Sequence, residues 1–71
     1  LGLTPLEALA ARIPSLLLDT PVARESCGEA ALYVQRDEPA AIARALEQLL
    51  YDETTRRALL TAAPAVLARY D

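Results

Sequence analysis

The clearest pattern in the chain is a helical repeat of apolar residues that follows Pro39. One stripe is apolar, and the opposite stripe carries Arg44, Glu47 and Gln48. This spacing predicts an amphipathic helix that starts at Pro39, where a proline suits the first turn and Asp37 or Glu38 adds favourable negative charge. The predicted inward residues are Ile42, Ala45, Leu46, Leu49 and Leu50.

A further helix is expected after Asp52, which can cap a helix that begins at Glu53. Its predicted inward positions are Leu59, Ala62 and Val66. Pro64 lacks the amide that a helix interior requires, so we expect two helical pieces, one before and one after it.

The first half of the chain contains two short apolar runs that indicate buried strands. Residues 13–18 follow the first predicted helix and are bounded by the turn sequence at 19–21. Residues 30–34 lie between Gly28 and a charged stretch, and Tyr33 is placed on the face of this second strand. Residues 22–28 are too short for a full helix, end in glycine and are interpreted as a crossover.

The start of the chain is a glycine-bearing loop that leads into a capped helix. Thr4 and Glu7 form a T-x-x-E capping box with Pro5 at the first helical position, so the helix should begin at Thr4 or Pro5 and end near Ala11 or Arg12. The free amides and the positive dipole end of such a start also suit a phosphate, although most capping boxes only cap.

Together these elements predict an α/β fold of the order helix, strand, crossover, strand, helix, helix. This order is a partial Rossmann-like parallel sheet. Two short strands leave unpaired edges that need further strands, a partner chain or exchanged elements. A homo-oligomer or a swapped dimer is therefore one expected outcome.

Composition and charge exclude several classes of function. The chain has 71 residues, 54% of them hydrophobic and 24% charged, with a net charge of −3 and no basic cluster larger than Arg56-Arg57, so nucleic-acid binding is not expected. It has no histidine and a single cysteine, Cys27, which predicts neither a zinc site nor an internal disulfide and fits a reducing, cytoplasmic location. No apolar run approaches the roughly 20 residues of a membrane-spanning helix.

An ordered set of positions stands out along the chain: residues 2–10, Pro14, residues 19–21, Glu25, Gly28 and residues 30–34. Taken together, they resemble the C-terminal half of retaining GT-B glycosyltransferases of the family-4, or group 1, type. The family segment reads E-G-F-G-L-x-x-L-E-A-x-A-x-G-x-P, and Glu7 matches its second glutamate. The first glutamate would lie two residues upstream of Leu1, so we expect the chain to be a fragment of the donor-binding domain, without the acceptor domain.

The resemblance implies roles for four residues in binding a nucleotide-diphosphate-sugar. Glu7 would accept hydrogen bonds from the hydroxyls of the donor ribose, because a carboxylate is a pure acceptor. The alternative is that Glu7 serves only as the carboxylate of the capping box. The backbone amides of Leu3 and Thr4 would hold the pyrophosphate, and Gly2 would lie beside the donor sugar or serve as an ordinary turn glycine. The family requires no metal or other cofactor, and its cationic diphosphate ligands lie upstream of Leu1.

One departure from the family pattern bears on backbone conformation. Arg12 stands where the family commonly has glycine, and a positive φ there would cost a non-glycine residue about 1 kcal/mol. The other candidates have plainer interpretations: Cys27 as a packed thiol, and Asp19 with Glu25 or Glu29 as solvated loop charges rather than an acid–base pair.

Two functions follow from the sequence. The first is an inactive piece of a glycosyltransferase that transfers a sugar to an acceptor hydroxyl with retention. The alternative is a non-catalytic α/β module that self-associates through strand edges and apolar helix faces.

Overall fold

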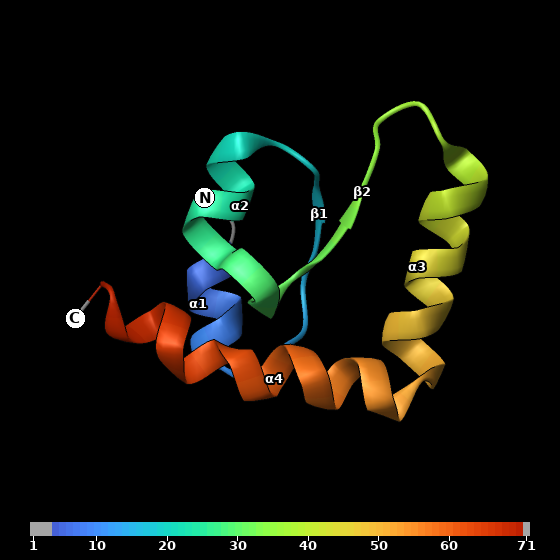
Figure 1. Ribbon diagram of the computed structural model, residues 1–71. Helices are drawn as coiled ribbons and strands as arrows, with labels where there is room; N and C mark the ends of the chain where they lie inside the picture. Colours follow the sequence, from blue (N-terminus) through green and yellow to red (C-terminus); the bar gives the residue numbers. More distant parts are fainter. Residues whose placement is uncertain (1–3, 71) are drawn as a thin grey trace.

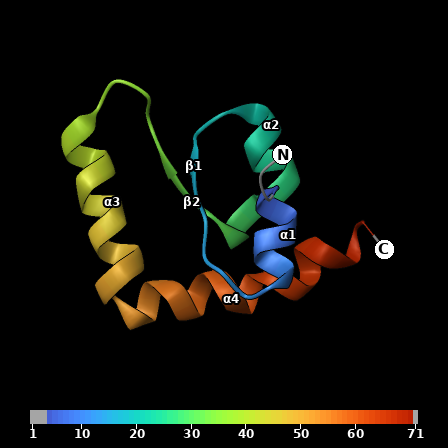
Figure 2. The same ribbon diagram turned by 180° about the vertical axis from the view of Figure 1, so that it is seen from behind.

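A computed structural model describes residues 4–70 as a small α/β arrangement built on two parallel strands (Figures 1 and 2). The strands pair in the register Leu16↔Leu32, Leu17↔Tyr33 and Leu18↔Val34. The predicted fold class is confirmed. The elements are α1 (Pro5–Ala10), β1 (Leu16–Leu18), α2 (Pro21–Cys27), the 3-10 turn η1 (Gly28–Ala30), β2 (Leu32–Val34), α3 (Pro39–Tyr51) and α4 (Glu53–Ala68).

The longest helix, α4, forms the base on which the other elements rest. It crosses beneath α1 and the lower end of the strands, while α3 rises from its first residues on the far side of the sheet (Figures 1 and 2). The core lies where α4 meets α1 and η1, and Leu6, Ala62 and Leu67 pack around it. Its buried members are Leu9, Ala30, Ala63 and Val66.

Two arginines of the C-terminal region donate to carbonyls near the ends of the earlier helices α2 and α3. Arg69 donates to the carbonyls of Glu25 and Ser26, at 2.8 and 3.2 Å, near the end of α2. Arg56 donates to the carbonyl of Leu49, at 3.1 Å, near the end of α3. Both guanidinium groups therefore satisfy carbonyls of a last helical turn, where the helix dipole also favours a cation.

The prediction that Pro64 divides the last helix was wrong, because α4 runs as a single helix through it. Proline inside a helix removes one hydrogen bond and costs about 3 kcal/mol. The buried side chains of Ala63 and Val66 flank the exposed Pro64 and face the same core. Packing on both sides of the proline therefore favours one continuous helix.

The predicted crossover at residues 22–28 is present, but residues 22–27 lie in a helix, α2, where the segment was expected to be too short for a full helix. The sequence does contain the signal for this helix, and it is Thr20. The Thr20 hydroxyl accepts a hydrogen bond from the Ala23 amide at 3.0 Å, and Pro21 occupies the first helical position. The turn sequence at 19–21 is therefore a helix start.

The strands are shorter than the apolar runs that predicted them. Residues 13–15 form the approach to β1, and Ala30 belongs to η1, where it is buried in the core. Each strand has one neighbour among residues 4–70, which leaves its outer edge unpaired in the described part of the chain. Self-association through these edges stays a prediction.

The helix α3 confirms the predicted start at Pro39, but only part of its apolar stripe is covered. Ala45 is buried, whereas Leu46 and Leu50 are 46% and 64% exposed. Within the described residues α3 packs on the strands and on α4, and these elements cover one side of the stripe.

Candidate functional site

The first turn of α1 has the predicted Thr4 hydroxyl cap. Thr4 is the N-cap in an extended conformation, and its hydroxyl accepts from the Glu7 amide at 3.2 Å. The same hydroxyl donates to the Glu7 carboxylate, with 3.3 Å between Oγ1 and Oε1, and Pro5 occupies the first helical position. This exchange satisfies one free amide and fixes the carboxylate beside the helix start.

Glu7 is exposed to solvent, so a ligand at the start of α1 can reach its carboxylate. One of its oxygens is engaged by Thr4, and a carboxylate has further lone pairs with which to accept from a ligand hydroxyl. The other predicted donor-binding residues, Gly2 and Leu3, lie outside the described residues. The roles of Gly2, Leu3, Thr4 and Glu7 in donor binding stay predictions.

A second polar cluster lies beside the two strands and was missed by the sequence analysis. Arg24 makes two hydrogen bonds to Asp19, with Nε to Oδ1 at 2.6 Å and a second nitrogen to Oδ2 at 2.9 Å, and stacks 4.3 Å above the Tyr33 ring. The Arg24 bonds hold the Asp19 pKa below its ordinary value. Asp19 is therefore a paired carboxylate rather than a free loop charge.

Tyr33 ties β2 to the end of α2. Its hydroxyl donates to the Gly28 carbonyl at 2.7 Å, with the Ala23 carbonyl as a longer second acceptor at 3.3 Å. Burial raises the pKa of Tyr33, so its hydroxyl keeps its proton at neutral pH and remains a donor. The sequence analysis placed Tyr33 on a face of the second strand. It did not predict the two acceptor carbonyls, because they belong to Ala23 and Gly28, outside that strand.

Cys27 is 2% exposed, which agrees with its interpretation as a packed thiol. Burial raises its pKa, so the nucleophilic thiolate is disfavoured. Within residues 4–70, no three His, Cys, Asp or Glu side chains gather in a way that could hold a metal ion.

Arg12 has the positive φ that its position suggested, with a value of 61°. The Arg12 amide bonds the Leu9 carbonyl and the Ile13 amide bonds the Ala8 carbonyl, each at 2.9 Å. This pair of bonds is a Schellman motif, in which the residue after the helix cap adopts the left-handed conformation that glycine prefers. Arg12 therefore closes α1 at the expense of backbone strain.

Replacing Arg12 with glycine is expected to raise the free energy of unfolding by about 1 kcal/mol, because glycine adopts the left-handed conformation without strain. Urea denaturation followed by circular dichroism measures this change. Arg12→Ala is the matched control, since alanine removes the same guanidinium but keeps a Cβ. Equal stability of the two variants would show that strain at position 12 is not relieved by glycine.

Comparison with known protein families decides the class of the chain. The family described as "Glycosyl transferases group 1" matches residues 1–66. The chain belongs to this glycosyltransferase family. A comparison with curated proteins and one with solved structures found no match.

Membership in the group 1 glycosyltransferases agrees with the observed fold. The parallel strands, the α2 crossover and the flanking helices are consistent with a partial Rossmann-like GT-B domain. The match includes the start of α1 and therefore Thr4 and Glu7. None of the helices within residues 4–70 is long and apolar enough to cross a membrane.

Proposed function

We propose that this chain is part of the C-terminal, donor-binding domain of a glycosyltransferase that uses a nucleotide-diphosphate-sugar. The enzyme would transfer the sugar to an acceptor hydroxyl with retention at the anomeric carbon, in the cytoplasm and without a metal. The observation that carries the proposal is the exposed Glu7 carboxylate, held by Thr4 one turn into α1 and inside the family match.

In this proposal Glu7 binds the donor ribose. A carboxylate can accept from two neighbouring hydroxyls, and a charged acceptor makes a stronger hydrogen bond than a neutral one. The amides that precede α1, together with the positive end of its dipole, would stabilise the diphosphate as it departs. Leu3 and Thr4 supply these amides, and Gly2 allows the donor sugar to come close.

We infer that the 71-residue chain alone does not catalyse transfer. Group 1 transfer needs cationic groups on the diphosphate, a bound acceptor and a donor. The chain thus contributes one wall of a donor site.

The test is the affinity of nucleoside diphosphates for the protein and for Glu7→Gln, measured by isothermal titration calorimetry with each common base. Glutamine keeps the side-chain oxygen that Thr4 bonds but removes the charge, so it separates ribose binding from capping. We expect the dissociation constant of the preferred nucleotide to rise about tenfold, since a bond to a charged group contributes about 1.5–3 kcal/mol.

Glu47→Gln is the matched control, because Glu47 is an exposed carboxylate on α3. Its affinity for the nucleotide should equal that of the unaltered protein. If Glu7→Gln also binds the nucleotide with unchanged affinity, Glu7 is only a capping residue and the proposed ribose contact is wrong.

A further inference from the structure

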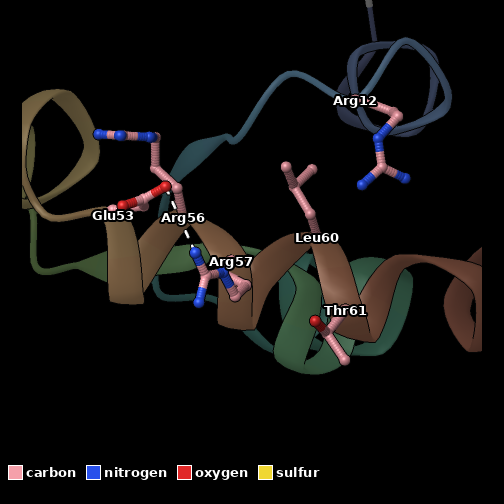
Figure 3. Close-up of a pocket in the computed structure, with 6 residues that line it drawn as sticks. All are labelled: Arg12, Glu53, Arg56, Arg57, Leu60 and Thr61. Atoms are coloured by element: carbon pink, nitrogen blue, oxygen red, sulfur yellow. Dashed lines mark ion pairs between the residues drawn. The ribbon is translucent and has the colours of Figure 1, made fainter.

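A groove at the opposite end of α1 from Glu7 has no role in the proposed donor site. It lies between the turn that closes α1 and the first half of α4, and its volume is about 310 Å³ (Figure 3). Pockets of this size accept small ligands. The residues that line it are Arg12, Glu53, Arg56, Arg57, Leu60 and Thr61.

The groove concentrates positive charge in an otherwise acidic chain. Three of the seven arginines line it against a single carboxylate, whereas the whole chain has a net charge of −3. Arg56 is partly engaged by the Leu49 carbonyl, and Arg57 pairs with Glu53 at 3.3 Å on the surface. Surface pairs of this kind contribute little, so the Arg57 guanidinium can exchange Glu53 for a ligand.

Arg12 gives the strongest indication that the groove binds a ligand. Figure 3 shows its guanidinium on one side of Leu60 and that of Arg57 on the other. No hydrogen-bond or ion-pair partner engages the Arg12 guanidinium within residues 4–70. Its backbone is strained at φ 61°, where glycine would close the helix more easily. A strained residue with a free cationic side chain in a pocket points to a binding role.

We propose that this groove binds a phosphate-bearing anion of the diphosphate type. Arginine presents a planar fork of donors that matches phosphate oxygens, and Arg12 and Arg57 provide two such forks. Because Leu60 separates them, a ligand with two phosphate groups reaches both forks better than a single phosphate does. Thr61 also lines the groove.

The anion has two possible sources, a soluble diphosphate or the phosphate headgroups of a membrane surface. Inorganic pyrophosphate is the probe for the first, and vesicles of phosphatidylcholine with and without phosphatidic acid are the probe for the second. The amide signals of Leu60 and Thr61 in nitrogen–proton NMR spectra of the protein report on the groove itself rather than on the start of α1. Binding of either probe at these signals supports the proposal and identifies the source.

Arg12→Gly and Arg57→Gln each remove one fork, and we expect each to weaken binding of the responding probe about tenfold, as for loss of a charge-assisted bond. Arg36→Gln changes the net charge equally at an exposed position outside the groove and should leave binding unchanged. Glu7→Gln should also leave it unchanged, which separates this groove from the donor site.

Three results would overturn the proposal. One is no response of the Leu60 and Thr61 signals to either probe. The second is unchanged binding in Arg12→Gly, a variant that keeps the α1 turn because glycine prefers its conformation. The third is an equal loss in Arg36→Gln, which would show a response to net charge alone.

Discussion

Replacing Leu9 with alanine is expected to lower the free energy of unfolding by about 3 kcal/mol. Leu9 is 2% exposed and sits in the core formed with Ala30, Ala63 and Val66. Two of these neighbours are alanines, whose short side chains cannot move into the space that the leucine leaves. A cavity therefore remains, and its loss of contacts adds to the lost burial of the side chain.

A decrease of this size is large for this chain, because small domains bury a small fraction of their surface and have a low total free energy of unfolding. Urea denaturation followed by circular dichroism at 222 nm gives the free energy. Leu50→Ala is the matched control, since Leu50 is 64% exposed and should change stability by less than about 0.5 kcal/mol. Similar losses in the two variants would show that α1 does not dock on α4 through Leu9.

Replacing Gly28 with alanine is expected to destabilise the protein by about 2 kcal/mol, through the backbone rather than through a clash. Gly28 has φ 51° and ψ −125°, a combination that side chains strongly disfavour. An added Cβ would lie 3.8 Å from Val66 Cγ2, which is an ordinary contact. The Gly28 carbonyl also accepts from Tyr33, so a shift of this turn would loosen the link between α2 and β2.

The same denaturation experiment measures the effect of Gly28→Ala. Glu29→Ala, one residue along the chain, is the control and should stay within about 0.5 kcal/mol of the unaltered protein. A Gly28→Ala variant as stable as this control would contradict the strain argument.

Local signals in the sequence predicted the elements that depend on nearby residues. The start of α1 followed from Thr4, Pro5 and Glu7, and the start of α4 followed from Asp52, whose carboxylate accepts from the Thr54 and Thr55 amides. These caps involve groups two or three residues apart, so spacing alone identifies them.

Features that depend on distant contacts could not be predicted in the same way. Pro64 suggested a break in the last helix, and this prediction failed because the local sequence does not reveal the packing of Ala63 and Val66 on α1 and η1. The Arg69 bonds to the end of α2 join residues more than 40 positions apart. Such contacts depend on how the helices assemble, which periodicity does not specify.

The residues of the candidate sites also differ in whether the local sequence could predict them. The capping box and the family resemblance placed Glu7 at the start of α1, and the positive φ of Arg12 followed from the glycine that the family has there. The groove between α1 and α4 was not predicted, because Arg12 and Arg57 come to lie on either side of Leu60 only when α4 folds beneath α1. Its one sequence signal was that unusual arginine.

The most direct test of the proposed function is a crystal structure of the protein with its preferred nucleoside diphosphate bound. The account predicts hydrogen bonds of about 2.6–3.0 Å between the Glu7 carboxylate and the ribose hydroxyls, with the diphosphate at the start of α1. A nucleotide bound with its ribose away from Glu7 would contradict it.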